Sequence, residues 1–225
     1  METKFPTGTA VFDWLLEGGY EHDCITTLYG PAGSGKTNIC LIAAAATPEG
    51  KKTVYIDTEG SFSISRLKQL RDDWRNVLER VIILQPTTFE EQKKVFEKLK
   101  ELVNDKIAMI ILDSSAMLYR LEMGKSKDVH AVNRALGTQL AYLTQIARKQ
   151  NVPVIITNQV YADFEDKDKV KMVGGDLLRY ASKCLIELQK SGKNRLAVLR
   201  KHRSIEEDKE VLFRIVDKGV EEVGS

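Results

Sequence analysis

The chain has 225 residues, of which 43% are hydrophobic and 29% charged, and its formal net charge is +2. This composition is typical of a folded globular protein and excludes a low-complexity or strongly polybasic chain. No apolar run approaches the ~20 residues that a bilayer requires, and the first residues lack the apolar core of a secretory signal. Three widely spaced cysteines (Cys24, Cys40, Cys184) suggest neither a disulfide framework nor a metal site, so we expect a cytoplasmic protein that does not bind membranes.

Apolar runs rich in Ile and Val alternate with segments of helical periodicity, which predicts βαβ units and a mainly parallel sheet. The predicted strands cover residues 25–29, 53–57, 81–84, 107–113 and 152–158, and the predicted helices cover 38–46, 63–74, 88–103 and 128–150. Residues 161–172 are polar and carry both charge signs, which indicates a mobile loop. Three short strands at 183–189, 195–200 and 211–216 then extend the sheet antiparallel at one edge.

Nothing in the sequence marks a linker or an internal repeat, so we expect one domain over residues 1–225. The predicted fold class is α/β, with a mainly parallel twisted sheet, helices on both faces and antiparallel C-terminal strands.

A complete phosphate-binding loop of the G-x-x-x-x-G-K-T type lies between the first predicted strand and the first predicted helix. Its glycines allow the backbone N–H groups to surround a polyphosphate, the Lys36 ammonium meets the β- and γ-phosphates, and the Thr37 hydroxyl ligates Mg²⁺. We therefore expect a nucleotide to be bound by Gly30, Pro31, Ala32, Gly33, Ser34, Gly35, Lys36, Thr37 and Asn38.

A second metal-binding group is predicted at Asp113, which ends the apolar run 108–112. An acidic residue at the carboxyl end of a buried strand lies at the edge where α/β sheets bind ligands. Together with Thr37, Asp113 is the expected site of Mg²⁺.

Two further polar residues follow predicted strands. Glu59, just beyond strand 53–57, has the chemistry to activate a water molecule, although a solvent-facing loop acid explains its position equally well. Gln159, beyond strand 152–158, can contact a γ-phosphate and report its presence to the loop that follows, or simply cap the strand. With Lys36, they are the candidate catalytic residues.

Taken together, these segments resemble the RecA/RadA recombinase superfamily, and most of all the short archaeal paralogues of RadA that lack its N-terminal DNA-binding domain. The resemblance covers nearly the whole chain and includes the entry segment 7–19, the phosphate-binding loop, the segment 55–67 and the segment 157–175. It implies a RecA-like P-loop NTPase core that uses ATP and Mg²⁺. It also implies that Glu59 activates water, that Gln159 senses the γ-phosphate and that Arg66 packs on the adenine.

The resemblance further implies an accessory protein of homologous recombination and DNA repair with weak, DNA-modulated ATPase activity. Segments 116–133 and 160–173 match the family's two DNA-facing loops, and the expected partners are single-stranded or junction DNA, a RadA-type recombinase and a Holliday-junction resolvase. The core begins near Thr7, and the second loop contains four acidic residues against three lysines, so only modest DNA affinity and weak homo-oligomerisation are expected.

Two other functions fit the same motifs. One is a nucleotide-gated adaptor that binds ATP without hydrolysing it and regulates a recombinase or a junction nuclease. The other is a clock-type or signalling ATPase of RecA fold, which explains segment 55–66 less well.

A basic run from Lys190 to Arg203 contains no acidic residue. A solvated or DNA-facing strand edge is its simplest interpretation. A second hypothesis is that Lys201 or Arg203 acts as a cationic finger on the γ-phosphate of a neighbouring subunit.

Overall fold

The structure is a computed structural model that describes residues 4–162 and 170–224. Half of the second predicted DNA-facing loop, residues 163–169, lies outside these residues. The strands are β1 (Ile25–Gly30), β2 (Lys52–Asp57), β3 (Val81–Leu84), β4 (Ile107–Asp113), β5 (Val154–Ala162), β6 (Val170–Met172), β7 (Cys184–Ser191), β8 (Asn194–Lys201), β9 (Glu210–Val216) and β10 (Gly219–Glu222). The helices are α1 (Ala10–Leu15), α2 (Lys36–Ala45), α3 (Ile64–Leu70), α4 (Trp74–Glu79), α5 (Phe89–Leu102), α6 (Met117–Lys125), α7 (Val129–Gln150) and α8 (Gly175–Ala181).

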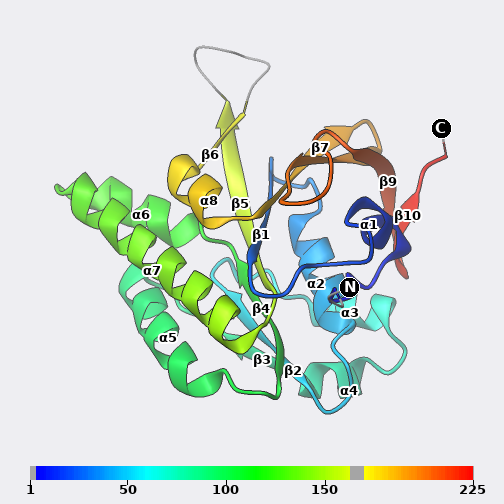
Figure 1. The fold of residues 1–225 in the computed structure, drawn as a ribbon, viewed down its shortest axis with the longest axis horizontal. Coiled ribbons are helices and arrows are strands. Elements are labelled where there is room, and N and C mark those ends of the chain that lie inside the picture. The colour runs from blue at the N-terminus through cyan, green and yellow to red at the C-terminus, as the bar shows by residue number, and fades with distance from the viewer. Residues whose placement is uncertain (1–3, 163–169, 225) are drawn as a thin grey trace.

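The described strands form one sheet in the order β10-β9-β8-β7-β1-β5-β4-β2-β3, and β6 pairs with the end of β5 (Figure 1). Strands β7, β1, β5, β4, β2 and β3 run parallel to one another, whereas β8, β9 and β10 continue the sheet antiparallel. The predicted α/β fold, with a mainly parallel sheet and antiparallel C-terminal strands, is confirmed.

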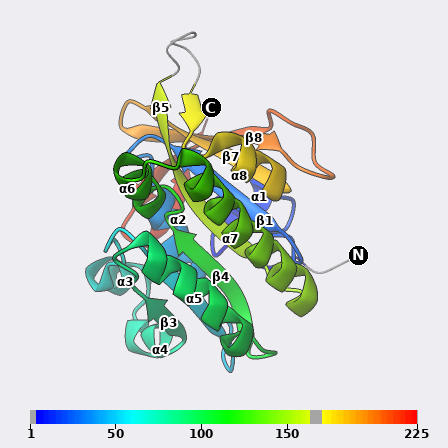
Figure 2. The same cartoon turned by 90° about the vertical axis from the view of Figure 1, so that its left-hand side faces the viewer.

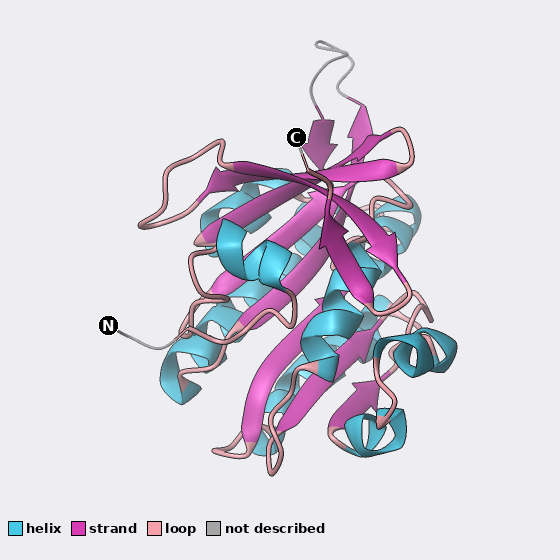
Figure 3. Ribbon diagram, turned by 90° about the vertical axis from the view of Figure 1, so that its right-hand side faces the viewer, coloured by secondary structure: helices cyan, strands magenta, loops and turns pink. Residues whose placement is uncertain are grey.

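Helices cover both faces of the parallel strands, with α5, α6 and α7 on one face (Figure 2) and α1 to α4 on the other (Figure 3). Successive side chains of a strand point to opposite faces, so each central strand supplies both cores. In β4, Met109 and Ile111 pack in the core that includes α1 and α2, whereas Ile110 and Leu112 pack in the core that includes α5 and α7. This double burial explains why the central strands read as continuous apolar runs.

The register of the parallel strands brings the predicted site residues to one edge. Gly30 at the end of β1 pairs with Gln159 in β5, and Asp57 at the end of β2 pairs with Asp113 at the end of β4. Because these strands are neighbours and parallel, their carboxyl ends form a continuous row.

Several element boundaries differ from the prediction. The predicted helix 63–74 is broken, because Arg71 adopts an extended conformation and α4 begins only at Trp74. The break lets Val77 of α4 pack with Leu67 of α3 and Ala45 of α2, a tertiary contact that helical periodicity does not reveal.

Other segments also differ from the prediction, and the helices α1 and α8 were not predicted. The expected loop 161–172 is partly strand, since β5 continues to Ala162 and pairs antiparallel with β6. Segment 116–133, matched to a DNA-facing loop, is largely helical because it contains α6 and the start of α7. Strand β10 was not predicted, because its short polar sequence does not indicate a strand. Its pairing with β9 stabilises it. Among the described residues, no helix is long and apolar enough to cross a bilayer.

Candidate nucleotide-binding site

The phosphate-binding loop joins β1 to α2 and depends on the conformational freedom of its glycines. Gly33 and Gly35 have φ values of +73° and +104°, in the region that side chains with a Cβ disfavour. A Cβ on Gly30 would lie 2.1 Å from the carbonyl oxygen of Leu188, so no other residue fits there. The Ser34 hydroxyl is buried without a hydrogen-bond partner among the described residues. This tight loop at the start of a helix, with an unmet polar group, fits the cradle that a polyphosphate requires.

Lys36 is buried in the first turn of α2 and folds back over the loop. Its Nζ donates to the carbonyl oxygens of Gly30 (2.8 Å) and Pro31 (3.0 Å). Burial lowers the pKa of Lys36, and the nearby Asp113 and Glu59 carboxylates oppose that change. Two neutral carbonyls thus hold the ammonium group, and a phosphate oxygen can replace them.

Asp113 accepts hydrogen bonds from a ring of hydroxyl groups. The Thr37 hydroxyl donates to Oδ2 over 2.8 Å, Tyr55 over 2.9 Å and Ser61 over 3.1 Å, while the Thr157 hydroxyl donates to Oδ1. Burial, reinforced by the Asp113 charge, raises the pKa of Tyr55 well above its usual value, so this hydroxyl remains a donor.

The two residues predicted to bind metal, Thr37 and Asp113, therefore lie within hydrogen-bond distance of each other. A hydroxyl and a carboxylate oxygen are hard ligands of the kind that Mg²⁺ prefers, and Mg²⁺ usually takes only one or two protein ligands beside phosphate and water. The described residues contain no cluster of three or more His, Cys, Asp or Glu side chains that could hold a metal by themselves. The donor set thus fits Mg²⁺ bound together with a nucleotide.

Sequence reasoning missed three of the Asp113 donors: Tyr55, Ser61 and Thr157. Tyr55 lies in β2, Ser61 in the loop after β2 and Thr157 in β5, and a hydroxyl within a strand looks in the sequence like any other strand residue. The one available signal was the position of Tyr55 and Thr157 near the carboxyl ends of predicted strands, where parallel sheets bind ligands.

Glu59 and Gln159, which the sequence placed 100 residues apart, contact each other. The Gln159 Nε2 donates to Glu59 Oε1 over 3.0 Å, and the Ser114 hydroxyl donates to the same oxygen. The backbone beneath is fixed by Thr58, whose N–H donates to Asp113 O (2.9 Å) and whose hydroxyl donates to Ser114 O (2.9 Å). Glu59 is therefore held beside the ring around Asp113, and a free solvent-facing loop acid is a poorer description of it.

Arg66 lies on α3 and binds the C-terminal hairpin. Its guanidinium donates to the carbonyl oxygens of Val216 (2.7 Å), Asp217 (3.1 Å) and Gly219 (3.2 Å). These in-plane bonds fix the orientation of the group, and its expected contact with adenine stays a prediction.

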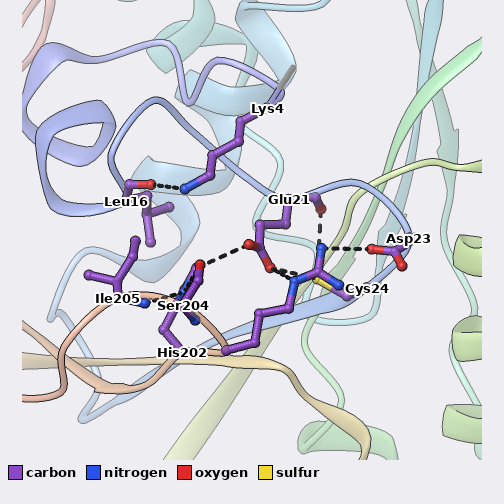
Figure 4. A network of polar contacts seen from close by, with 9 residues as sticks. Lys4, Leu16, Glu21, Asp23, Cys24, His202, Ser204 and Ile205 are labelled. Atoms are coloured by element: carbon purple, nitrogen blue, oxygen red, sulfur yellow. Dashed lines mark hydrogen bonds and ion pairs between the residues drawn. The ribbon is translucent and has the colours of Figure 1, made fainter. Parts of the chain in front are cut away.

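The end of the basic run lies at the opposite edge of the sheet from the phosphate-binding loop. Lys201 at the end of β8 pairs in register with Leu185 near the start of β7, and its Nζ donates to the carbonyl oxygens of Arg179 and Ser182. Arg203 forms ion pairs with Glu21 and Asp23, next to the buried His202 (Figure 4). Neither cation can reach the loop of its own chain from this edge.

Comparison with known proteins gives a consistent result. The Rad51 family model matches residues 3–223. Proteins named DNA repair and recombination protein RadB are similar over most of their length: that of Methanobrevibacter smithii is 41% identical, with 96% of this chain and 95% of the relative covered, and that of Methanocaldococcus jannaschii is 41% identical, with 92% and 97% covered. A solved structure described as the crystal structure of the RadB recombinase superposes with a TM-score of 0.84 and 37% identity, covering 98% of this chain and all of the other.

Proposed function

The chain belongs to the Rad51 family, and from this membership and the site geometry we propose that it is a DNA recombination and repair protein that binds ATP with Mg²⁺ and hydrolyses the ATP slowly. One observation supports this proposal above all. Lys36, Asp113, Glu59 and Gln159 come from four different segments and meet at the carboxyl edge of adjacent parallel strands. That arrangement supplies a phosphate-binding cation, a metal ligand, a base and a sensor within one site.

In this proposal each residue has a defined task. Backbone N–H groups of residues 33–37 bind phosphate oxygens, and Lys36 leaves the carbonyls of Gly30 and Pro31 to meet the β- and γ-phosphates. Thr37 and Asp113 would hold Mg²⁺, directly or through water, and the ion would supply charge neutralisation at those phosphates. Glu59 accepts the proton of the attacking water through its carboxylate.

Gln159 links the site to the strands that project from the sheet. Its amide now binds Glu59, and β5 continues from it to Ala162 beyond the other strand ends (Figure 1). When ATP binds, we expect the Gln159 amide to leave Glu59 and to bind the γ-phosphate. That exchange changes the conformation of the β5–β6 ribbon, as in a switch of the order–disorder type. Single-stranded or junction DNA is the ligand proposed for that ribbon.

The test is ATP hydrolysis with and without single-stranded DNA, for the wild type and for Glu59→Gln. We expect slow turnover that DNA stimulates in the wild type, and loss of turnover with retained ATP binding in the variant. Wild-type protein that binds no ATP would refute the proposal.

A second function, the non-hydrolysing adaptor, is favoured by the contacts of Glu59. Ser114 and Gln159 both donate to its Oε1, so this oxygen is occupied by protein groups and is not free to accept a hydrogen bond from an attacking water. Tight ATP binding without turnover in both proteins would identify this function. The partner would then be a RadA-type recombinase or a junction resolvase, and mass measurement with ATP-Mg²⁺ and DNA would show whether the chain joins it or forms weak homo-oligomers.

A further inference from the structure

The outer side of the phosphate-binding loop packs against the C-terminal antiparallel strands. A Cβ on Gly30 would meet Leu188 of β7, and one on Gly35 would lie 3.2 Å from Ile215 of β9. Gly33 lies between them and faces the β7–β8 hairpin. A Cβ on Gly33 would lie 3.2 Å from Lys190 Nζ. The C-terminal strands therefore form a wall against which the loop takes its shape.

Arg195 connects this wall to the loop directly. Its Nε donates to the carbonyl oxygen of Gly33 over 3.0 Å. Its NH1 donates to the carbonyls of Lys193 (3.3 Å) and Asn194 (2.8 Å), which fix the guanidinium on the hairpin turn. Among the described residues, Arg195 forms no ion pair with a carboxylate, so its bond to the loop does not compete with a stronger partner.

The geometry of the peptide bond gives this contact a consequence for ligand binding. The peptide unit between Gly33 and Ser34 is planar and trans, so its C=O and N–H point in opposite directions. With the Gly33 oxygen held outward by Arg195, the Ser34 N–H points into the loop, where it now donates to Pro31 O over 3.2 Å. A cradle for phosphate needs its N–H groups on that inner side.

We infer that Arg195 is a positioning residue for the phosphate-binding loop: it orients the Gly33–Ser34 peptide unit toward the phosphates without touching them. This inference rests on the proposed nucleotide binding. Lys190, which pairs in register with Arg195, adds positive charge beside Gly33. The hairpin thus supplies both a directed bond and a positive field to the loop.

The experiment measures ATP and adenosine affinity by calorimetry for the wild type, R195A, R195K and K193A, with thermal unfolding of each nucleotide-free protein as a check of folding. Lys193 is the matched control, because it carries the same charge on the same turn and its side chain makes no bond to the loop among the described residues. We expect R195A to bind ATP roughly fivefold to tenfold more weakly, with partial rescue in R195K, less than a twofold change in K193A, and unchanged adenosine affinity in all three.

Equal losses in R195A and K193A would show that only net charge matters and would overturn the inference. Equal losses for ATP and adenosine in R195A would also overturn it, because adenosine has no phosphate for the loop to bind. Wild-type protein that binds no ATP would instead overturn the proposed function. If R195A does not fold, R195M replaces it, because Met keeps the aliphatic length of the side chain but has no N–H group to donate to Gly33.

Discussion

Two polar clusters at opposite edges of the sheet use their charges differently. In the strand-end cluster, formed by Lys36, Thr37, Glu59, Asp113 and Gln159, the charged groups bind neutral partners: carbonyls hold Lys36, and hydroxyls and an amide hold the two carboxylates. In the Glu21 cluster, formed by Glu21, Asp23, His202 and Arg203, cation and carboxylate pair directly (Figure 4). Neutral dipoles exchange readily for a charged ligand, whereas direct ion pairs leave little charge to offer.

The comparison separates a site from a structural connection. The Glu21 cluster joins the segment before β1 to the segment after β8, and its groups satisfy one another. The strand-end cluster collects as many charges, but their protein partners are neutral groups. We therefore expect substitutions in the strand-end cluster to change ligand binding and turnover, and substitutions in the Glu21 cluster to change stability alone.

The largest effect is expected for Lys36→Ala. Loss of the ammonium group removes the one side-chain cation that the described site offers to the β- and γ-phosphates, so ATP affinity should fall by roughly 100-fold, about 2.7 kcal/mol. Titration calorimetry measures it, with Lys193→Ala as the control for net charge. Unchanged affinity would mean that the strand-end cluster is not the nucleotide site, and the comparison would fail.

Ser114→Ala should have a smaller effect that is confined to turnover. The variant removes the hydrogen bond from the Ser114 hydroxyl to Glu59 Oε1, so Glu59 loses a fixed orientation. The phosphate-binding loop stays intact. We expect the rate of phosphate release to fall about tenfold, while ATP affinity stays the same. Faster phosphate release would show instead that Ser114 restrains Glu59, and would favour the non-hydrolysing adaptor.

The Glu21 cluster should respond to pH. Burial, with help from the Lys4 and Arg203 charges and opposed by Glu21 and Glu17, lowers the pKa of His202 below its usual value of about 6.5. The unfolded chain then binds more protons than the folded one just below that value, so the His202 contribution to stability is complete above about pH 6.5 and is lost as pH falls.

Denaturant unfolding between pH 5 and pH 8 measures this dependence. His202→Gln should flatten the part of the profile below pH 6.5, whereas His130→Gln, at an exposed position, should leave it unchanged. A profile that His202→Gln does not alter would show that the imidazole is not the titrating group.

Arg203→Ala should have the smallest effect. Its side chain is 39% exposed, so loss of its pairs should lower the free energy of unfolding by about 1 kcal/mol or less. Turnover per chain should be the same as in the wild type at every protein concentration. Turnover that rises with concentration in the wild type alone would support the cationic-finger hypothesis and would assign the Glu21 cluster a second role between subunits.

Much of the site was predictable because its chemistry is local in the sequence. The phosphate-binding loop is eight consecutive residues, and Asp113, Glu59 and Gln159 each follow a recognisable apolar run. Parallel strands bring such ends together by topology alone. The donors Tyr55, Ser61 and Thr157 to Asp113 and the Ser114–Glu59 contact were not predictable. Each joins residues in, or just beyond, separate strands whose register the sequence does not state.

The sequence by itself determined the fold class and predicted the kind of ligand, since apolar periodicity and one glycine-rich loop carry both. Only the tertiary structure decided where the residues of the basic run lie. In the sequence they form one cluster from Lys190 to Arg203. Strand β8 crosses the sheet, so Arg195 lies against the phosphate-binding loop while Arg203 lies at the far edge, paired with Glu21. An extended strand advances about 3.3 Å per residue, and residues close in sequence therefore meet different neighbours.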